Sequence, residues 1–347
     1  MGRRTTGSEV GRFALVILFL MAAISCYVAY FCFSLAFRPS STGSLDSRID
    51  DGFETSEEGG GEDGDCCKGV EHLELWGDAV KWGSDFKLNS SKDCCLACKA
   101  TCVGHDGSCL CDSWVFCGDK QACGSRFGEC WLKKQKDTWE PDRRDSGDHV
   151  MWTSGLVFGK GKGIVGLETE YGVLRIKLLP DCAPHSVSFI LEMLRWHHCA
   201  GCHFYRAESR GDSWDSEGNH VKHVRCFEYY TSFGPPFALI QGTLQGYGMT
   251  DRPIATEACP TIKRGSVAWV GSGPELFISL ANHIEWKKAH TVFGYVLPED
   301  MEIVEKIAQL PTKLEVWSNI NVAVLEKPIP FSVRRIDLKN DMGSRGV

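Results

Sequence analysis

Cysteine is the residue type best suited to chemistry in this sequence, because 18 of its 347 residues are cysteines. Eleven of them fall within a single stretch and are Cys66, Cys67, Cys94, Cys95, Cys98, Cys102, Cys109, Cys111, Cys117, Cys123 and Cys130. That density is typical of a scaffold held by disulfides in an oxidising compartment. Structural zinc is the alternative, since Cys95 and Cys98, like Cys199 and Cys202, have the spacing of zinc ligands.

The number of cysteines limits how they can pair. Eleven is an odd number, and five more cysteines follow residue 180, so a disulfide between the two groups is arithmetically possible. The connectivity itself cannot be read from the sequence. The run His197-His198-Cys199-x-x-Cys202-His203 has the composition of a metal or redox site, but a local disulfide is favoured if the compartment is oxidising. A serine hydrolase has no support in the sequence, because no G-x-S-x-G or equivalent occurs.

The N-terminal region predicts such a compartment. Residues 13–37 contain no charged side chain, and about 20 apolar residues suffice to cross a bilayer. The apolar part of a cleaved signal peptide is shorter, roughly 7 to 15 residues. Arginines precede the run and acidic residues follow it, so residues 1–12 are expected in the cytosol. We therefore predict a single-pass signal anchor that sends the rest of the chain into the secretory lumen, with the Golgi favoured, or outside the cell.

Charge is concentrated just after this span. The chain carries a net charge of -7, and residues 44–65 hold nine acidic residues against one arginine. Residues 38–65 are rich in Gly, Ser, Asp and Glu and predict a flexible acidic stalk, with an acidic docking tail as the alternative. Because no basic stripe occurs elsewhere, a nucleic-acid partner is not expected.

Residues 66–136 form the cysteine-rich module, in which short apolar segments alternate with cysteines. Its C-C-x-x-C, C-D-S-W-V-F-C and C-W-L-K-K motifs resemble a PAN/Apple-type domain. That resemblance implies a small disulfide-stapled fold with a protein or carbohydrate ligand. Asn89-Ser90-Ser91 is an N-glycosylation acceptor sequence, which fits the predicted luminal side. Residues 137–163 have the composition of a linker.

The last module, residues 164–338, predicts mainly β-structure. Residues 173–178 alternate like a strand after a Tyr171-Gly172 turn signal, and Pro184 begins an apolar pattern of helical spacing. A further strand ends at Arg206, a polar excursion covers residues 207–236, and several short strands with Gly-rich turns follow. Together with a second helix near 299–310, this pattern predicts a closed antiparallel barrel capped by two helices. A short tail, residues 339–347, ends the chain.

Three motifs in this order resemble the cyclophilin family of prolyl isomerases. They are A-P-x-x-V-x-x-F followed by F-Y-R, then I-Q-G, and finally H-T-V-F-G-Y-V preceded by a tryptophan. The resemblance implies an eight-stranded barrel and isomerisation of X-Pro peptide bonds, without a metal or cofactor. Proline-containing protein segments would then be the partners.

The resemblance also implies a role for individual residues. It makes Arg206 the catalytic arginine and Gln241 the glutamine that holds the substrate backbone. The remaining substrate-binding positions are Leu239 and Phe277 in the proline pocket, Trp286 and His290 at its wall, and Gly271 beside it. A structural alternative exists for three of these residues: Arg206 as a surface arginine paired with Glu208, Phe277 as core, and His290 as a hydrogen-bonded structural histidine.

The sequence departs from the family pattern at several positions. Ala238 stands where a phenylalanine is usual, with Phe237 one position earlier. Trp269 and Val270 replace smaller residues, which predicts a narrower neighbouring pocket. The long excursion at 207–236 is expected to cover or reshape the site. Two functions remain open: a peptidyl-prolyl cis-trans isomerase, and a binding module that has lost turnover and recognises Pro-containing segments or glycans. A third reading, a mere scaffold, has no feature in its favour.

Overall fold

The computed structural model describes residues 66–102, 108–195, 199–221, 235–245, 253–257 and 260–336. All of them belong to one of the two units into which the chain divides, Gly60–Val347. The span predicted at 13–37 and the stalk at 38–65 lie outside the described residues. Among the helices that are described, none has the length and apolar character needed to cross a membrane.

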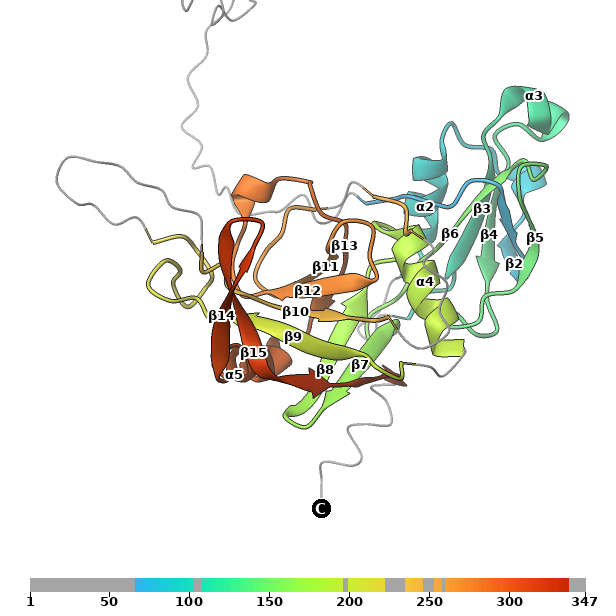
Figure 1. Ribbon diagram of the computed structural model, residues 1–347. Helices are drawn as coiled ribbons and strands as arrows, with labels where there is room; N and C mark the ends of the chain where they lie inside the picture. The colour runs from blue at the N-terminus through green and yellow to red at the C-terminus, as the bar shows by residue number, and fades with distance from the viewer. Residues whose placement is uncertain are drawn as a thin grey trace, which may run out of the picture. The chain divides into compact units, whose positions relative to one another are not determined.

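The cysteine-rich part is built on a four-stranded antiparallel sheet with the order β2-β4-β3-β6. Its strands are β2 (Asp78–Lys81), β3 (Ser113–Cys117), β4 (Cys130–Lys134) and β6 (Trp152–Leu156). A separate ribbon pairs β1 (Leu73–Leu75) with β5 (Arg143–Ser146). Three short helical segments, η2 (Gly83–Asp85), α3 (Lys120–Cys123) and η3 (Gly124–Arg126), connect the strands. Helix α2 (Ser91–Lys99) packs against β3 and β4 (Figure 1).

Helix α2 begins where its sequence provides an N-cap. The Ser90 hydroxyl accepts a hydrogen bond from the Asp93 amide at 3.1 Å, which satisfies one of the free N–H groups of the first turn. Cys94, Cys95 and Cys98 then follow at spacings that place them on the buried side of the helix. The helix is therefore fixed to its surroundings by disulfides rather than by a broad apolar face.

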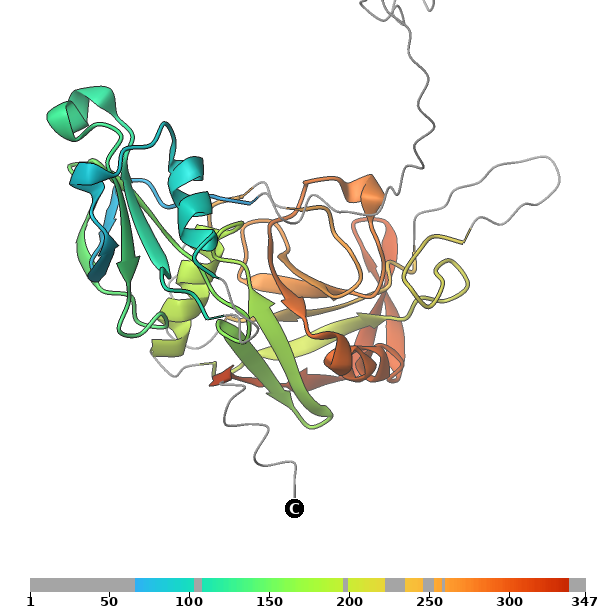
Figure 2. The ribbon, with the colours of Figure 1, turned by 180° about the vertical axis from the view of Figure 1, so that it is seen from behind.

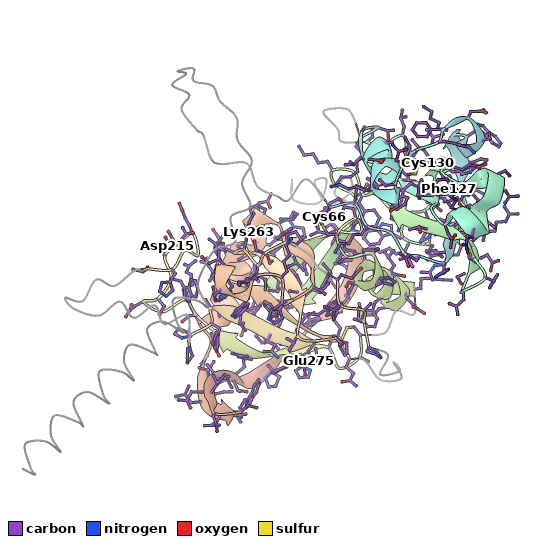
Figure 3. All side chains as sticks on the ribbon, turned by 90° about the horizontal axis from the view of Figure 1, so that it is seen from above. Cys66, Phe127, Cys130, Asp215, Lys263 and Glu275 are labelled. Carbon is purple, nitrogen blue, oxygen red and sulfur yellow. A yellow bond between two sulfur atoms is a disulfide. The ribbon has the colours of Figure 1, made fainter. Side chains whose placement is uncertain are left out.

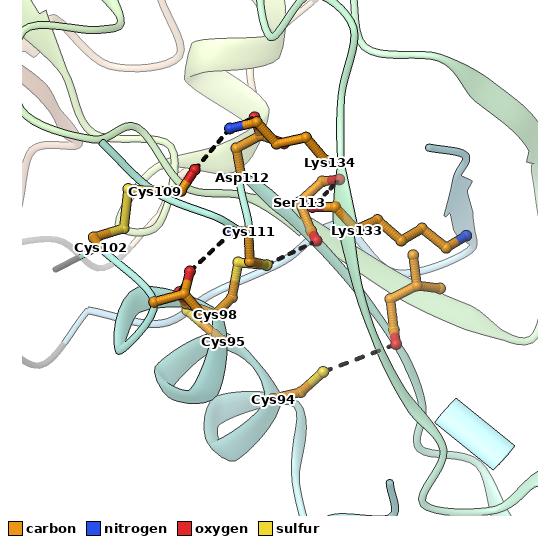
Figure 4. Close-up of a disulfide and its surroundings, with 12 residues drawn as sticks. Cys94, Cys95, Cys98, Cys102, Cys109, Cys111, Asp112, Ser113, Lys133 and Lys134 are labelled. Carbon is orange, nitrogen blue, oxygen red and sulfur yellow. Dashed lines mark hydrogen bonds and ion pairs between the residues drawn. A yellow bond between two sulfur atoms is a disulfide. The ribbon is translucent and has the colours of Figure 1, made fainter. Parts of the chain in front are cut away.

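Seven disulfides join the fourteen cysteines of the described residues. They are Cys66–Cys182, Cys67–Cys95, Cys94–Cys130, Cys98–Cys111, Cys102–Cys109, Cys117–Cys123 and Cys199–Cys202. Figure 4 shows several of these cysteines between α2 and the sheet. All eleven cysteines between Cys66 and Cys130 are paired. Ten of them pair within this stretch, and Cys66 pairs with Cys182, which gives the disulfide between the two groups of cysteines that the odd number made possible. Cys199 and Cys202 form a disulfide with each other.

The segment 137–163, expected to be a linker, contributes two strands instead. Strand β5 pairs with β1, and β6 pairs with β3 along its whole length. All four residues of β5 are exposed, so no apolar alternation marks this strand in the sequence. The disulfide-rich sheet thus extends to Leu156, and the PAN/Apple identity of this module remains a prediction.

The second module is a strongly curved antiparallel sheet of ten strands (Figures 1 and 2). Its order is β14-β15-β9-β10-β12-β11-β13-β8-β7-β16. The strands are β7 (Ile164–Thr169), β8 (Gly172–Leu178), β9 (His203–Glu208), β10 (Leu239–Thr243), β11 (Ser266–Trp269), β12 (Glu275–Ser279), β13 (Val292–Val296), β14 (Thr312–Trp317), β15 (Ile320–Pro330) and β16 (Ser332–Ile336). Short segments η4 (Ile284–Trp286) and η5 (Pro298–Asp300) lie between strands.

Over the residues that it describes, the structure confirms the mainly β architecture but does not show the predicted barrel as a closed ring of eight strands. The sheet has ten strands, because the segment 312–330 folds into the hairpin β14–β15. Its pairing among the described strands also ends at two edges, β14 and β16, rather than closing into a ring. The chain turns at Phe331, whose amide donates to the Cys202 carbonyl, and passes from β15 beside β9 to β16 beside β7. The two sides of the curved sheet are therefore joined by the backbone at this corner.

Two helices pack against this sheet, as the sequence predicts. Helix α4 (Pro184–Arg195) buries the apolar stripe that begins at Val187, and the Glu257 carboxylate accepts hydrogen bonds from the first-turn amides of His185 and Ser186. Helix α5 (Met301–Ala308) packs against β8, β9 and β10. Asp300 precedes it and accepts two hydrogen bonds from the Arg175 guanidinium, at 2.7 and 2.8 Å.

Candidate active site on strands β9, β10 and β12

Strand register brings three of the predicted site residues into one row. Gln241 on β10 lies opposite Arg206 on β9 and opposite Phe277 on β12. Side chains directly opposite each other in antiparallel strands project to the same face of the sheet. Leu239 and Glu208 are also opposite each other, two residues along the same strands. Arg206, Gln241 and Phe277 therefore share one face with Glu208 and Leu239.

The Arg206 guanidinium is fixed by three hydrogen bonds. Its Nε and Nη2 both donate to Oε1 of Glu208, at 2.9 and 2.8 Å, and its Nη1 donates to Oε1 of Gln241 at 3.0 Å. The rings of Phe237 and Trp317 lie 5.6 and 5.7 Å from its central carbon. Only 12% of the Arg206 side chain is exposed. Arg206 is thus paired with Glu208, as the structural alternative supposed, but inside the site and not on an open surface.

Glu208 makes this arrangement rigid. Its side chain is 3% exposed, and its second oxygen accepts the Phe237 amide at 2.7 Å. A buried carboxylate with several charge-assisted hydrogen bonds has little freedom to move. Two guanidinium N–H groups remain without a partner among the described residues, since three of the five donors are engaged. These two can donate to a bound substrate.

Gln241 connects Arg206 to a second polar pair. Its amide nitrogen donates to the Tyr205 hydroxyl at 2.6 Å and to Oε2 of Glu275 at 3.4 Å. Burial, reinforced by Glu275, raises the pKa of the Tyr205 hydroxyl above its ordinary value. Tyr205 therefore stays protonated and neutral at physiological pH. Both polar atoms of the Gln241 side chain are thus hydrogen-bonded, and its oxygen helps to hold Arg206 in position.

An aromatic group surrounds Phe277, whose side chain is buried. The Trp286 ring meets it edge-on with centroids 5.7 Å apart, and the His290 ring does so at 5.2 Å. Trp286 and His290 are themselves 5.3 Å apart. The Nδ1 atom of His290 lies 3.2 Å from the Trp269 carbonyl, which orients the ring with Nδ1–H as donor. These three rings form an apolar corner beside Arg206 and Gln241.

Phe237 completes this corner from a shifted position. Ala238 is buried with a φ of +50°, a left-handed conformation that turns the backbone just before β10. The Phe237 ring consequently lies between Arg206, at 5.6 Å, and Trp286, at 6.2 Å. An alanine in this conformation costs roughly 1–2 kcal/mol, which the surrounding packing must offset. The aromatic side chain missing at position 238 is thus replaced by its neighbour.

The expected narrowing by Trp269 does not occur through that side chain. Trp269 is buried in the core, where its ring stacks on Phe293 with centroids 4.1 Å apart and meets Phe189 edge-on at 5.8 Å. Gly271 has a φ of +59°, and no atom lies within 4 Å of the place where a Cβ would stand. Gly271 therefore keeps open space around it. Leu239 is buried within β10.

His283 is a residue of this site that the sequence did not single out. Its fully buried ring stacks on Trp286, with centroids 3.7 Å apart and the planes within 5°. Its ring nitrogens lie 2.6 Å from Oε1 of Glu285 and 2.8 Å from the Phe237 carbonyl. Burial lowers the pKa of His283, although the Glu285 carboxylate opposes the shift. The neutral ring has one N–H for two acceptors, and it supports both Trp286 and Phe237.

The described residues of the 207–236 excursion pack against His283 and do not cover the site. Trp214 packs edge-on against His283 at 4.8 Å, and its indole N–H donates to the Pro236 carbonyl at 3.2 Å. The Asp215 turn that follows lies well apart from Glu275 (Figure 3). The sequence signal for Trp214 was a large ring in an otherwise hydrophilic segment, whereas nothing in the sequence marks His283. Residues 222–234 of the excursion lie outside the described ranges.

The sequence also raised two further sites, glycosylation at Asn89 and metal binding in the run from His197 to His203. Asn89 is exposed in the loop that leads into α2, and its glycosylation remains a prediction. Within the described ranges, no group of three or more His, Cys, Asp or Glu side chains is placed to hold a metal ion. His197 and His198 lie outside those ranges.

Comparison with known proteins identifies the second module. Residues 164–327 match the family model "Cyclophilin type peptidyl-prolyl cis-trans isomerase/CLD". The chain therefore contains a cyclophilin-type domain, the domain of peptidyl-prolyl cis-trans isomerases. A search of curated proteins found no match.

Solved cyclophilins are among the structures similar to this chain. A cyclophilin-type peptidyl-prolyl cis-trans isomerase of Cryptosporidium parvum is 15% identical, with a TM-score of 0.36, and the similarity covers 50% of this chain and 97% of that one. A cyclophilin of Hirschia baltica is 17% identical, with a TM-score of 0.29, covering 52% and 76%. At such scores the assignment of the domain rests on the family model.

Proposed function

We propose that this protein is a membrane-anchored peptidyl-prolyl cis-trans isomerase that acts on X-Pro bonds of secretory-pathway or membrane proteins. The observation that carries the proposal is the fixed Arg206 guanidinium beside the aromatic corner of Phe277, Trp286 and His290. In this proposal Arg206 is the catalytic residue. The aromatic corner holds the proline ring of the substrate.

The chemistry follows from the nature of the X-Pro bond. Rotation about this amide has a barrier of about 18–20 kcal/mol, and the prolyl nitrogen regains its lone pair when the bond is twisted. A guanidinium N–H directed at that nitrogen is worth more in the twisted state than in the planar ground state. Because Glu208 and Gln241 already hold Arg206 in place, little reorganisation is needed when the substrate binds. The apolar corner confines the proline ring and limits the rotation to one bond.

The proposed location has two supports. Seven disulfides among the described residues fit an oxidising compartment, and the uncharged run at 13–37 fits a signal anchor. The disulfide-rich module would then lie in the lumen or outside the cell with the isomerase domain. We propose a protein or carbohydrate ligand for this module, in keeping with its resemblance to PAN/Apple domains.

A binding module without turnover is a second candidate function. The observation in its favour is that the Gln241 side chain is already hydrogen-bonded to Arg206, Tyr205 and Glu275. To hold a substrate backbone, the Gln241 amide would have to give up its hydrogen bond to Tyr205 or Glu275. If that exchange is too costly, the aromatic corner would bind Pro-containing segments without accelerating their isomerisation.

The test compares cis-trans exchange rates of a panel of X-Pro tetrapeptides with the full-length protein, its disulfides intact. We expect wild-type protein to accelerate exchange and Arg206→Ala to lower kcat/KM by about 100-fold or more, the usual cost of removing one preorganised donor. Arg334→Ala is the matched control, since Arg334 pairs with Glu168 in the same sheet but at the exposed edge strand β16. Equal rates for wild type and Arg206→Ala would refute the catalytic role. Peptide binding without acceleration would support the second candidate.

A further inference from the structure

The disulfide-rich module contains a cleft that the isomerase proposal does not use. It lies on the face of the four-stranded sheet opposite α2 and has a volume of about 540 Å³. Alternation along β4 separates the two faces: Lys134 reaches the Cys109 carbonyl on the disulfide side, whereas Lys133 reaches the Leu75 carbonyl on the other. Figure 4 shows the two lysines leaving the strand in opposite directions. The ribbon of β1 and β5 forms the border of this cleft, which Glu74 and Arg144 line.

Four tryptophans line the cleft. Trp76 and Trp82 are 50% and 61% exposed, which is unusual for the largest apolar side chain. Trp131 meets Trp82 edge-on, with ring centroids 5.3 Å apart, and Trp152 lies at the buried end. Exposed aromatic rings around a concave surface usually mark a binding site, because a ligand recovers the apolar area that water otherwise covers.

The polar groups of the cleft are mainly donors. Lys133 is 5% exposed, and its ammonium has three N–H groups, of which one donates to the Leu75 carbonyl at 2.8 Å. The same ammonium lies 4.7 Å from the Trp76 ring and 5.9 Å from the Trp131 ring. Among the described residues no hydrogen bond uses the indole N–H of Trp76 or Trp82. The floor and both walls can therefore donate to a ligand.

Two of the three carboxylates that line the cleft are already engaged, and the third, Asp78, lies on the exposed strand β2. The Glu74 carboxylate pairs with Arg144 at 3.4 Å, and Glu129 accepts the Trp131 indole N–H at 3.1 Å. A sugar, whose hydroxyl groups both donate and accept, would find few free acceptors here. A ligand that offers only acceptors and apolar rings fits the cleft better.

A polyproline-II segment has this combination. Proline has no backbone N–H, its carbonyl groups point into solvent in this conformation, and its rings present apolar ridges. Aromatic-lined grooves are a common binding site for such segments because the peptide is already ordered before it binds. We propose that the cleft bounded by Trp76, Trp82, Trp131 and Lys133 binds a proline-rich, polyproline-II segment of a protein partner. This site is separate from the proposed isomerase site and does not depend on its activity.

Binding of a deca-proline peptide to the full-length protein, followed by intrinsic tryptophan fluorescence and by calorimetry, tests the proposal. We expect saturable binding that Trp82→Ala weakens at least 10-fold, because this exposed ring can be removed without disturbing the core. Lys133→Met removes the buried donor while keeping the length of the side chain, and we expect a loss of at least 5-fold. Leu110→Ala is the matched control, since Leu110 is also an exposed apolar residue of the same module but does not line the cleft.

Further measurements separate this site from the isomerase site. Arg334→Ala, at the edge strand β16 and outside both sites, should leave deca-proline binding unchanged, and a Gly/Ser peptide of ten residues should not bind. The proposal is overturned if Trp82→Ala and Lys133→Met bind deca-proline like the wild type, or if Arg206→Ala alone abolishes binding. Binding of a free oligosaccharide that Trp82→Ala weakens, with none of deca-proline, would also overturn it in favour of a glycan site.

Discussion

Arg206 is held in place by two neighbouring side chains, and Glu208 makes the larger contribution. The sequence predicted Arg206, Gln241 and Phe277 through motif order, and strand register then places them in one row. The sequence offered the pairing of Arg206 with Glu208 as an alternative at the surface, but it could not predict that Glu208 would be buried, because a charged residue in a strand is usually exposed. Nor could it reveal His283, whose role depends on a ring stack formed by separate segments.

Glu208 is expected to act as a positioning residue for Arg206. Glu208→Ala should lower kcat about 10- to 100-fold with little change in KM, because small displacements of a catalytic group are costly while the aromatic corner stays intact. Glu208→Gln should recover part of the loss, since an amide oxygen can still accept from Arg206. Steady-state kinetics on one X-Pro peptide would check this. An unchanged or increased kcat for Glu208→Ala would contradict the role.

Lys177 predicts a pH dependence of stability. Its ammonium donates to the Gly159 carbonyl at 2.7 Å, and burial lowers its pKa from 10.5 to about 8. Between pH 8 and 10.5 the unfolded chain therefore binds more protons at this site than the folded chain. The free energy of unfolding should consequently rise with pH across this window.

Denaturant unfolding at several pH values between 8 and 10 would measure this slope. Lys177→Met should reduce the slope, because a side chain that does not titrate contributes nothing to the difference in bound protons. Part of the slope should remain, because burial also lowers the pKa of Lys133 to about 8. Lys313→Met serves as the control: Lys313 is exposed, and its hydrogen bond with Glu315 raises its pKa. A slope in Lys177→Met as steep as in the wild type would show that this lysine is not responsible.

Among the elements, strand β10 depends on close approach to β9. The register between them shifts at Gln241 and Gly242, and a Cβ on Gly242 would lie 2.6 Å from the His203 carbonyl oxygen. A glycine is needed here because backbone atoms occupy the space. The strand itself was predictable from its apolar pattern and the I-Q-G motif, whereas the bulge was not.

Gly242→Ala should therefore destabilise the protein and disturb the site. Relieving the clash requires β9 and β10 to move apart, at a cost of about 1–3 kcal/mol typical of overpacking, and this separates Arg206 from Gln241. Gly124→Ala is the control: Gly124, unlike Gly242, has a positive φ, but no atom lies within 4 Å of its Cβ position, so only the backbone cost of order 1 kcal/mol applies. Thermal unfolding and isomerase rates would be compared. Equal losses in the two variants would argue against the close-approach account.

Other elements differ in how far the sequence predicts them. Helices α4 and α5 begin and end close to the expected residues because apolar spacing and Pro184 mark them clearly. Strand β5 is fully exposed, and β14 buries none of its residues, so neither has the alternation that identifies a half-buried strand. Strand β5 pairs with β1 in the separate ribbon, and β14 adds one strand at an edge of the cyclophilin-type sheet.

At the scale of the whole molecule, the two modules form a continuous structure. One apolar core includes Leu73 and Val115 of the disulfide-rich module together with the interior of the cyclophilin-type sheet. The Cys66–Cys182 disulfide joins the modules across 116 residues, and Lys99 donates to the Asp181 carboxylate at 2.6 Å beside it. The composition indicated two separate domains, because burial between modules leaves no pattern along the chain.

Removing the Cys66–Cys182 bridge should strongly destabilise the protein. In the chain-entropy description, a disulfide that closes a loop of about 100 residues contributes roughly 4–5 kcal/mol. Replacing Cys117 and Cys123 by serine opens a loop with a separation of only 6 residues, so its cost should be ~2–3 kcal/mol smaller. Chemical unfolding of the two double-serine variants would measure the difference. A smaller loss from the 66–182 pair than from the 117–123 pair would contradict this expectation.

The central claim is that the cyclophilin-type domain turns over X-Pro bonds. The most direct measurement is two-dimensional NMR exchange spectroscopy on an X-Pro peptide with a catalytic amount of the full-length wild-type protein. Uncatalysed exchange takes tens to hundreds of seconds and gives no cross-peaks at short mixing times. The account predicts cross-peaks between the cis and trans resonances within a mixing time of about one second. Absence of these cross-peaks, while the resonances shift or broaden on binding, would contradict it and leave a proline-recognition module.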